Sequence, residues 1–235
     1  FIEALDAGFT DFIIGVGGSA TNDGGAGMIQ AMGGELTDSS GKDIAPGGIA
    51  LADLAHIDIS ELDPRMAEVK VEVACDVNNP LCGARGASAI FGPQKGATSE
   101  DVQQLDAALA NFAEVISKDL NTDVADIPGA GASGGLGAGL MGFFDARLRL
   151  GADIVLEAVG LEKHLVDADL VIVGEGQFDR STVSNKSPVA VAQRAKIKGI
   201  PVIGIAGSLG AGFAEVHDHG IDAVFSLVNR PMSLK

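Results

Sequence analysis

The chain has 235 residues, 46% of them hydrophobic, and a formal net charge of −16 at pH 7. This negative charge argues against binding to nucleic acid or to anionic membranes. The apolar runs fall short of the ~20 residues that a membrane-spanning helix needs. The two cysteines, Cys75 and Cys82, give no disulfide framework and favour the cytoplasm as the compartment.

The first residues have the pattern of a helix already under way. Residues 1–8 lack an initiator Met and predict the middle of a helix that ends at Gly8. They carry no signal-peptide pattern. We therefore expect the chain to be a fragment of a longer protein.

A glycine-rich segment, residues 15–28, follows the apolar run 12–14 and is the most informative part of the sequence. Its glycines let backbone N–H groups approach a ligand closely, and Ser19, Thr21 and Asn22 add short hydrogen-bonding groups. Asp23 adds a charge able to face a metal ion. This combination is typical of a loop that holds a carboxylate or phosphate. The plain alternative is a turn whose glycines serve tight packing alone.

Two familiar phosphate-binding motifs were compared with this segment. A P-loop is excluded, because no Gly-Lys-Ser or Gly-Lys-Thr occurs in the sequence. Gly15, Gly17 and Ala20 do fit the dinucleotide pattern G-x-G-x-x-G/A. However, the acidic residue expected at the end of a strand about 20 positions later is missing, because Glu35 lies in a turn-like stretch. The dinucleotide pattern is therefore a weak indication.

The middle of the chain predicts a strand, a helix and a second glycine-rich segment. Residues 69–73 alternate as a half-buried strand does, and Asp76 and Asn79 follow it. Residues 99–120 predict a helix with one apolar face that belongs to the core. The second glycine-rich segment, residues 129–139, is compatible with another anion-binding loop or with a tightly packed helix of small residues.

From residue 169 onward, short apolar runs alternate with helical patterns. We expect strands at 170–173, 201–206 and 223–228, with helices at 187–199, capped by Ser187, and at 213–219. This alternation predicts βαβ units and a parallel sheet, and hence an α/β fold. Ligands bind at the carboxyl ends of such strands, where Glu175 and Asp179 are expected.

Taken together, these motifs resemble the first class of bacterial glycerate kinases. Several unusual motifs occur in the right order, so the resemblance is specific and covers essentially the whole chain. The segments that carry it are residues 17–25, 74–76, 79–81, 91–97, 129–131, 174–176, 207–209 and 230–233.

The resemblance implies two α/β domains, one Rossmann-like with a parallel sheet and one mixed, with the active site between them. Residues 1–165 would form the second, mixed domain, and residues 166–235 the C-terminal part of the Rossmann-like domain. An N-terminal part of the family chain would be missing. The implied reaction transfers the γ-phosphoryl group of ATP, with Mg²⁺, to a hydroxyl of glycerate. A second copy of the chain, in a homo-oligomer, is a further candidate partner.

The resemblance also implies site residues, because phosphoryl transfer requires mainly positioning and charge compensation. The candidate catalytic acids are Asp76, Asp23 and Glu175, one of which would accept the hydroxyl proton. Asp179 is the candidate ligand for Mg²⁺. Local departures from the family pattern, such as Gln177 where Arg is common, leave Arg180 and Lys186 as basic candidates for the phosphates. The groups expected to bind substrate or phosphate are Gly17, Gly18, Ser19, Thr21, Asn22, Asn79, Lys95, Arg180 and Lys186.

Two functions from other classes remain as alternatives. The first is a dinucleotide-dependent oxidoreductase that uses residues 15–20 for its cofactor. The second is a non-catalytic fragment that folds or associates without activity.

Overall fold

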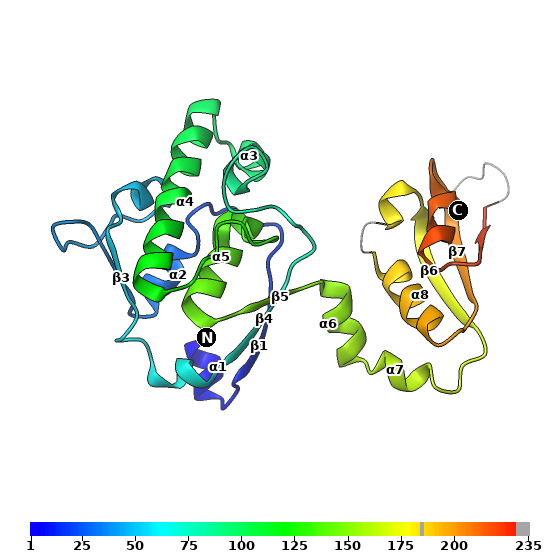
Figure 1. Ribbon diagram of the computed structural model, residues 1–235. Helices are drawn as coiled ribbons and strands as arrows, with labels where there is room; N and C mark the ends of the chain where they lie inside the picture. The colour runs from blue at the N-terminus through cyan, green and yellow to red at the C-terminus, as the bar shows by residue number, and fades with distance from the viewer. Residues whose placement is uncertain (184–185, 229–235) are drawn as a thin grey trace, which may run out of the picture. The chain divides into compact units, whose positions relative to one another are not determined.

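A computed structural model describes residues 1–183 and 186–228, and the chain divides into two compact units, Phe1–Arg149 and Leu150–Lys235 (Figure 1). Each unit has its own parallel sheet and its own hydrophobic core. The α/β fold predicted from the sequence is confirmed. The domain boundary near residue 165 stays a prediction, and it lies C-terminal to the division between the two units.

The first unit is built on a parallel sheet in the order β1-β4-β5, formed by Asp11–Gly15, Lys70–Ala74 and Arg147–Arg149. Val71 and Val73 alternate with polar residues along β4, and both are buried against α5 (Ala132–Phe144). A short antiparallel pair, β2 (Glu35–Thr37) and β3 (His56–Asp58), lies apart from this sheet. Glu35 therefore begins a strand, and the prediction of a turn at that residue is wrong.

The helix predicted at residues 99–120 is confirmed as α4, Ser99–Leu120. Thr98 and Asp101 form a reciprocal capping box at its start, which satisfies backbone N–H groups that have no partner inside the helix. Its apolar face packs into the core through residues such as Leu109, Phe112 and Ile116. The remaining helices of the unit are α1 (Ile2–Asp6), α2 (Ala26–Ala31) and α3 (Ala87–Phe91), with 3₁₀ turns η1 (Gly48–Asp53), η2 (Pro64–Glu68) and η3 (Pro93–Lys95).

The second glycine-rich segment forms the tightly packed start of α5. Ser133, Gly134 and Gly135 have φ values of 53°, 68° and 91°, so the backbone is left-handed before the regular helix begins. A Cβ at Gly134 would lie 2.1 Å from the carbonyl oxygen of Thr21, and one at Gly139 would lie 2.0 Å from that of Gly24. The two glycine-rich segments therefore pack backbone against backbone.

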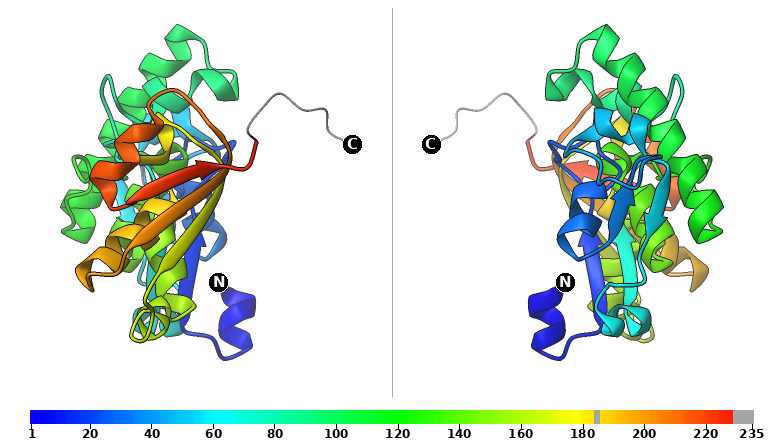
Figure 2. Two further views of the ribbon diagram at one scale, coloured as in Figure 1. Left: turned by 90° about the vertical axis from the view of Figure 1, so that its right-hand side faces the viewer. Right: turned by 90° about the vertical axis from the view of Figure 1, so that its left-hand side faces the viewer.

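The second unit has the βαβ arrangement expected from the sequence. Its strands β6 (Val171–Phe178), β7 (Val202–Leu209) and β8 (Ala223–Ser226) are parallel, in that order (Figure 2). Helix α8 (Ser187–Ile197) and the 3₁₀ turn η5 (Phe213–His219) contribute to the core on one face. The other elements are α6 (Gly151–Ala158), α7 (Leu161–His164) and η4 (Arg180–Val183).

Several details of this unit differ from the sequence-based expectations. Strand β6 continues to Phe178, because Gln177 and Phe178 pair with β7, so Glu175 lies within the strand and not beyond its end. Ser187 is the first helical residue, and Lys186 occupies the cap position. Residues 213–219 form a 3₁₀ helix. The motif at residues 230–233 lies outside the described residues.

The opposite face of the second sheet is apolar and exposed. Ile172 pairs in register with Ile203, and Ile205 with Phe225, so these four side chains share one face. Ile172 is 61% exposed and Phe225 57%. Parallel sheets are normally covered on both faces, so this surface is unusual for such a sheet.

None of the helices within the described residues is long and apolar enough to cross a membrane.

Candidate active site

The first glycine-rich segment and Asp76 leave neighbouring strands at the same edge of the sheet. β1 and β4 are parallel, with Gly15 opposite Ala74, and the N–H of Val16 still donates to the carbonyl of Ala74 at 3.3 Å. Two residues farther along each chain lie Gly17 and Asp76. The carboxyl ends of adjacent parallel strands are where α/β proteins bind ligands, so the sheet brings these two predicted site elements together.

The backbone at Gly17 and Gly18 is open to a ligand. A Cβ built at either glycine would meet no atom within 4 Å, and Gly18 has a left-handed φ of +62°. These glycines are therefore not required by packing, unlike Gly24, whose Cβ would lie 2.3 Å from the Phe112 ring. Ser19 is half-buried and Thr21 is exposed beside them. The open stretch is the part of the loop suited to hold an anion.

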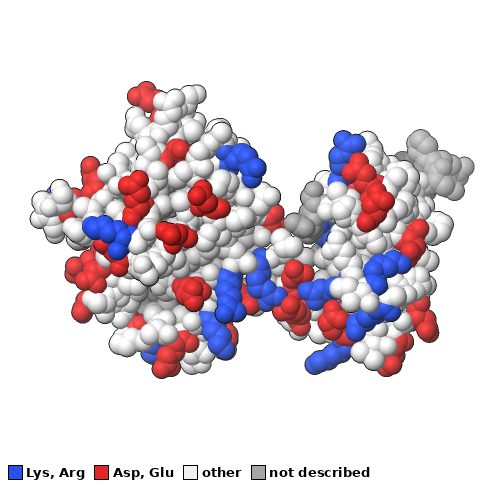
Figure 3. Space-filling model, viewed as in Figure 1, with Lys and Arg blue, Asp and Glu red and all other residues white. Residues whose placement is uncertain are grey.

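Lys95 supplies a positive charge next to this loop. Its Nζ donates to the carbonyl of Thr21 at 2.6 Å, and partial burial lowers the pKa of the ammonium while the charge of Asp23 opposes that shift. A small pocket of about 270 Å³ beside it is lined by residues that include Asn22, Gly92, Lys95 and Leu105. Figure 3 shows acidic side chains spread over the face of this unit that is in view, with few basic ones among them.

Asn22 is hydrogen-bonded to a buried serine, Ser88, which the sequence did not predict as part of the site. Its amide Nδ2 donates to Oγ of Ser88, which is fully buried, at 3.0 Å. The Oδ1 atom of Asn22 is buried and has no hydrogen-bond partner among the described residues. Such an acceptor costs about 1–3 kcal/mol when buried. Nothing in the sequence around Ser88 indicates this contact, because it depends on tertiary packing.

The carboxylate of Asp23 stabilises the loop through hydrogen bonds to its backbone. One carboxylate oxygen accepts from the N–H of Gly25 at 3.1 Å, and the other accepts from Gly27 at 3.2 Å. These bonds satisfy backbone groups at the start of α2. The carboxylate nevertheless lies close enough to Lys95 to influence its pKa. Asp23 thus fixes the shape of the loop, and its predicted catalytic role stays a prediction.

Asp76 and Asn79 lie in the segment after β4. Asp76 is exposed directly beyond the strand end. Asn79 donates through Nδ2 to the carbonyl of Arg85 at 2.8 Å, and its own carbonyl accepts from Gly129 and Gly131. Asn79 therefore ties this segment to the second glycine-rich segment.

The four remaining candidates belong to the second unit. Glu175 accepts from the N–H of Gly176 at 3.1 Å. Asp179 accepts from the N–H and Oγ of Ser181, at 2.8 and 2.6 Å, and these bonds lower the pKa of its carboxyl, helped by the charge of Lys186. Arg180 pairs with Glu215 at 2.8 Å. Asp179 thus also has a turn-forming role at η4, and its predicted metal-binding role stays a prediction.

A parallel α/β sheet whose first strand leads into an open, glycine-rich loop beside a lysine places the chain among the α/β proteins, with this loop as its candidate anion site. The sequence pattern of the Glycerate kinase family matches residues 1–235. The chain belongs to this family.

Individual relatives agree with the family assignment. A protein named glycerate kinase from Bacillus subtilis is 57% identical over 96% of this chain. One named glycerate 2-kinase from Escherichia coli is 55% identical over 97%. A crystal structure of a glycerate kinase 2 from Salmonella typhimurium LT2, so described, is 56% identical, covers 96% of this chain and superposes with a TM-score of 0.84.

The relatives are considerably longer than this chain. It spans 59% of the Bacillus subtilis protein, 60% of the Escherichia coli protein and 58% of the Salmonella chain.

Proposed function

We propose that a full-length protein containing this chain transfers the γ-phosphoryl group of MgATP to a hydroxyl of glycerate. The observation that supports this most directly is the open backbone at Gly17 and Gly18, in a loop whose Thr21 carbonyl binds Lys95, in a chain of the Glycerate kinase family. An open run of backbone N–H groups and a nearby cation suit a carboxylate or phosphate.

ATP and Mg²⁺ are the cofactors that this reaction requires. The open glycine backbone and Lys95 fit an anionic ligand of either kind, substrate carboxylate or phosphate. Mg²⁺ in phosphoryl-transfer sites usually takes only one or two carboxylates, with phosphate oxygens and water completing its shell. The described residues contain no cluster of three or more metal-binding side chains. When bound, Mg²⁺ neutralises charge that develops on the transferred phosphoryl group.

Among the candidate acids of the first unit, Asp76 is the best suited to accept the proton of the substrate hydroxyl. It lies two residues after Ala74, the last paired residue of β4, and Gly17 lies two residues after Gly15, the residue of β1 that pairs with Ala74. Asp23 uses both carboxylate oxygens for backbone N–H groups of its own loop. We therefore assign the general base to Asp76 and the shaping of the loop to Asp23.

We also propose that residues 166–235 are the C-terminal part of a Rossmann-like domain. The exposed apolar face at Ile172 and Phe225 supports this, because a parallel sheet is stable when both faces are covered. The longer relatives have additional sequence that would supply the cover. Glu175, Asp179, Arg180 and Lys186 are then candidates for contacts to the nucleotide within this domain.

The oxidoreductase alternative is not supported. A dinucleotide fingerprint requires the helix to begin within the glycine motif, whereas here α2 begins only at Ala26, after the irregular segment 18–25.

The two cysteines are free, which agrees with a cytoplasmic location as part of this proposal.

The proposal is tested by measuring ADP release by the full-length protein with Mg²⁺. We expect turnover that depends on glycerate and saturates with it. A matched hydroxy acid that lacks the second hydroxyl, lactate, serves as the control. Equal ADP release with and without glycerate would contradict the proposal. Assaying residues 1–235 alone in parallel would show whether this part is active by itself.

A further inference from the structure

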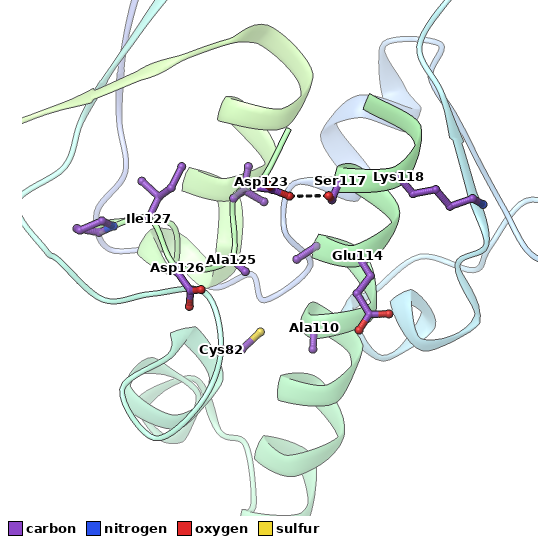
Figure 4. Close-up of a pocket in the computed structure, with 12 residues that line it drawn as sticks. Cys82, Ala110, Glu114, Ser117, Lys118, Asp123, Ala125, Asp126 and Ile127 are labelled. Carbon is purple, nitrogen blue, oxygen red and sulfur yellow. Dashed lines mark hydrogen bonds between the residues drawn. The ribbon is translucent and has the colours of Figure 1, made fainter. Parts of the chain in front are cut away.

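A second, larger groove lies in the first unit, away from the glycine loop. It has a volume of about 900 Å³ and runs between the C-terminal half of α4 and the segment 123–128, with Cys82 at one end (Figure 4). The part of α4 that lines it extends from Ala110 to Lys118, a length of about 12 Å at the helical rise per residue. This size suits a small organic molecule.

The walls of the groove are fixed by hydrogen bonds. Ser117 donates to the carboxylate of Asp123 at 2.5 Å, which joins α4 to the opposite wall (Figure 4). The carbonyl of Ala125 accepts from the N–H of Leu81 at 2.9 Å. Asn121 ends α4 in a left-handed conformation that turns the chain back along the helix. The groove is therefore a preformed feature of the fold.

The lining of the groove combines apolar surface with negative charge. Apart from Cys82, its apolar part consists of Ala110, Ala113, Val124, Ala125, Ile127 and Pro128. Three carboxylates, those of Glu114, Asp123 and Asp126, also line it, and within the described residues none of the three has an ion-pair partner.

Lys118, the one lysine among the described lining residues, makes its contacts outside the groove. Figure 4 shows Lys118 pointing away from the segment 123–128. Its Nζ lies 3.3 Å from the carbonyl of Ala55 and 3.5 Å from the Asp119 carboxylate. The groove also runs toward the C-terminus of α4, and the negative end of a helix dipole favours a cation.

From the apolar walls and the three carboxylates we propose that the groove binds a small organic cation. This ligand carries an ammonium group on an apolar body that fits along the lining part of α4. The apolar body would cover the alanines of α4 and Val124, and the ammonium would lie among Glu114, Asp123 and Asp126. The binding is separate from phosphoryl transfer and does not depend on the function proposed above.

Cys82, at one end of the groove, lies within the influence of two carboxylates. Burial raises the pKa of its thiol to about 12, and the charges of Asp106 and Asp126 add to the effect. Burial is the larger cause, and the smaller contribution of the two carboxylate charges has the sign that favours a cation.

The proposal is tested by an NMR titration of the ¹⁵N-labelled chain with 2-phenylethylammonium. We expect saturable shifts confined to the amides of residues 110–118 and 123–128. The neutral analogue 2-phenylethanol, of nearly the same shape, should bind more weakly. Replacing one carboxylate, in Asp126→Asn or Glu114→Gln, should weaken binding about 2- to 5-fold, as expected for a solvent-exposed ion pair.

Glu100→Gln is the matched control, because Glu100 lies in the first turn of α4, outside the groove. It should leave the affinity unchanged. Three outcomes would overturn the proposal: equal binding of the alcohol and the ammonium, shifts centred on residues 15–22, or the same loss in Glu100→Gln as in Asp126→Asn.

Discussion

Gly18 combines a left-handed backbone conformation with open space in which a ligand could lie. Its φ is +62°, and a Cβ there would meet no protein atom within 4 Å. Valine at this position would be strained, since β-branched residues rarely adopt left-handed angles, and its methyl groups would occupy the space proposed for the anion. We expect Gly18→Val to raise the KM for glycerate or ATP sharply in the full-length protein while the fold survives.

Gly41→Val is the matched control for this prediction. Gly41 also has a left-handed φ, +82°, with open space around it, but it lies in the turn after Asp38. The two variants should therefore lose similar stability in thermal unfolding, and only Gly18→Val should lose affinity. Unchanged kinetics in Gly18→Val would make the loop a packing feature.

Asp76 allows a test that separates catalysis from turn formation. Asp76→Asn preserves size and the ability to cap a turn but removes the basic carboxylate. Loss of a general base typically lowers the rate about 10²- to 10⁴-fold, and we expect a fall of that order in kcat with little change in Tm. Asp11→Asn, an exposed position at the opposite end of the neighbouring strand β1, should leave kcat unchanged. Near-normal turnover by Asp76→Asn would show that Asp76 is structural.

At the scale of elements, Arg65 joins α1 to η2. Its guanidinium contacts Asp6 at 2.9 Å and donates to Asp63 through Nε at 2.9 Å. Hydrogen bonds from Arg65 lower the pKa of the Asp63 carboxyl to about 2. A lowered pKa contributes stability above the unfolded value, about 3.9, and that contribution is lost as the pH falls through about 2.

We therefore expect the Asp63 carboxyl, followed by ¹³C NMR, to titrate near 2 in the native chain and closer to its ordinary range in Arg65→Gln. The stability difference between the native chain and Asp63→Asn should be present at neutral pH and vanish toward pH 2. If the stability difference persisted unchanged at low pH, the negative charge of Asp63 would not be its source.

The elements also show what the sequence could and could not predict. Helix α4 was predictable to the residue because its apolar period and its cap, Thr98 with Asp101, are local. The extension of β6 to Phe178 was not, because the glycines and Gln177 conceal a strand that pairing with β7 creates. The second glycine-rich segment remained ambiguous because its packing on Thr21 and Gly24 depends on contacts more than 100 residues apart in sequence. In the candidate site, the open loop and Lys95 were predicted, but the support from Ser88 was not.

At the scale of the whole molecule, the exposed apolar face of the second sheet allows the proposed larger domain to be tested. In residues 1–235, we expect the double variant Ile172→Thr/Phe225→Thr to bind less of the apolar dye ANS than the native chain. In a full-length protein, where we propose that the face is covered, the same changes should lower the free energy of unfolding, as large-to-small core substitutions do by about 2–5 kcal/mol each.

Ile197→Thr provides the control in both proteins. Ile197 is 87% exposed on α8, outside this face, so it should change stability little in either length of chain. If the double variant were neutral in the full-length protein, the face would not be covered there and the assignment of residues 166–235 to a larger domain would fail.

The backbone contacts between the two glycine-rich segments have a consequence for protein engineering. Gly134 and Gly139 lie against the carbonyls of Thr21 and Gly24 without an intervening side chain. No rotamer at this contact can adjust, so substitutions there cannot fine-tune the position of the loop that we propose holds the anion. Variants selected for a new hydroxy acid should therefore carry their changes at apolar side chains that line the adjoining pocket, such as Ile49 and Leu105, and leave Lys95 and these glycines intact.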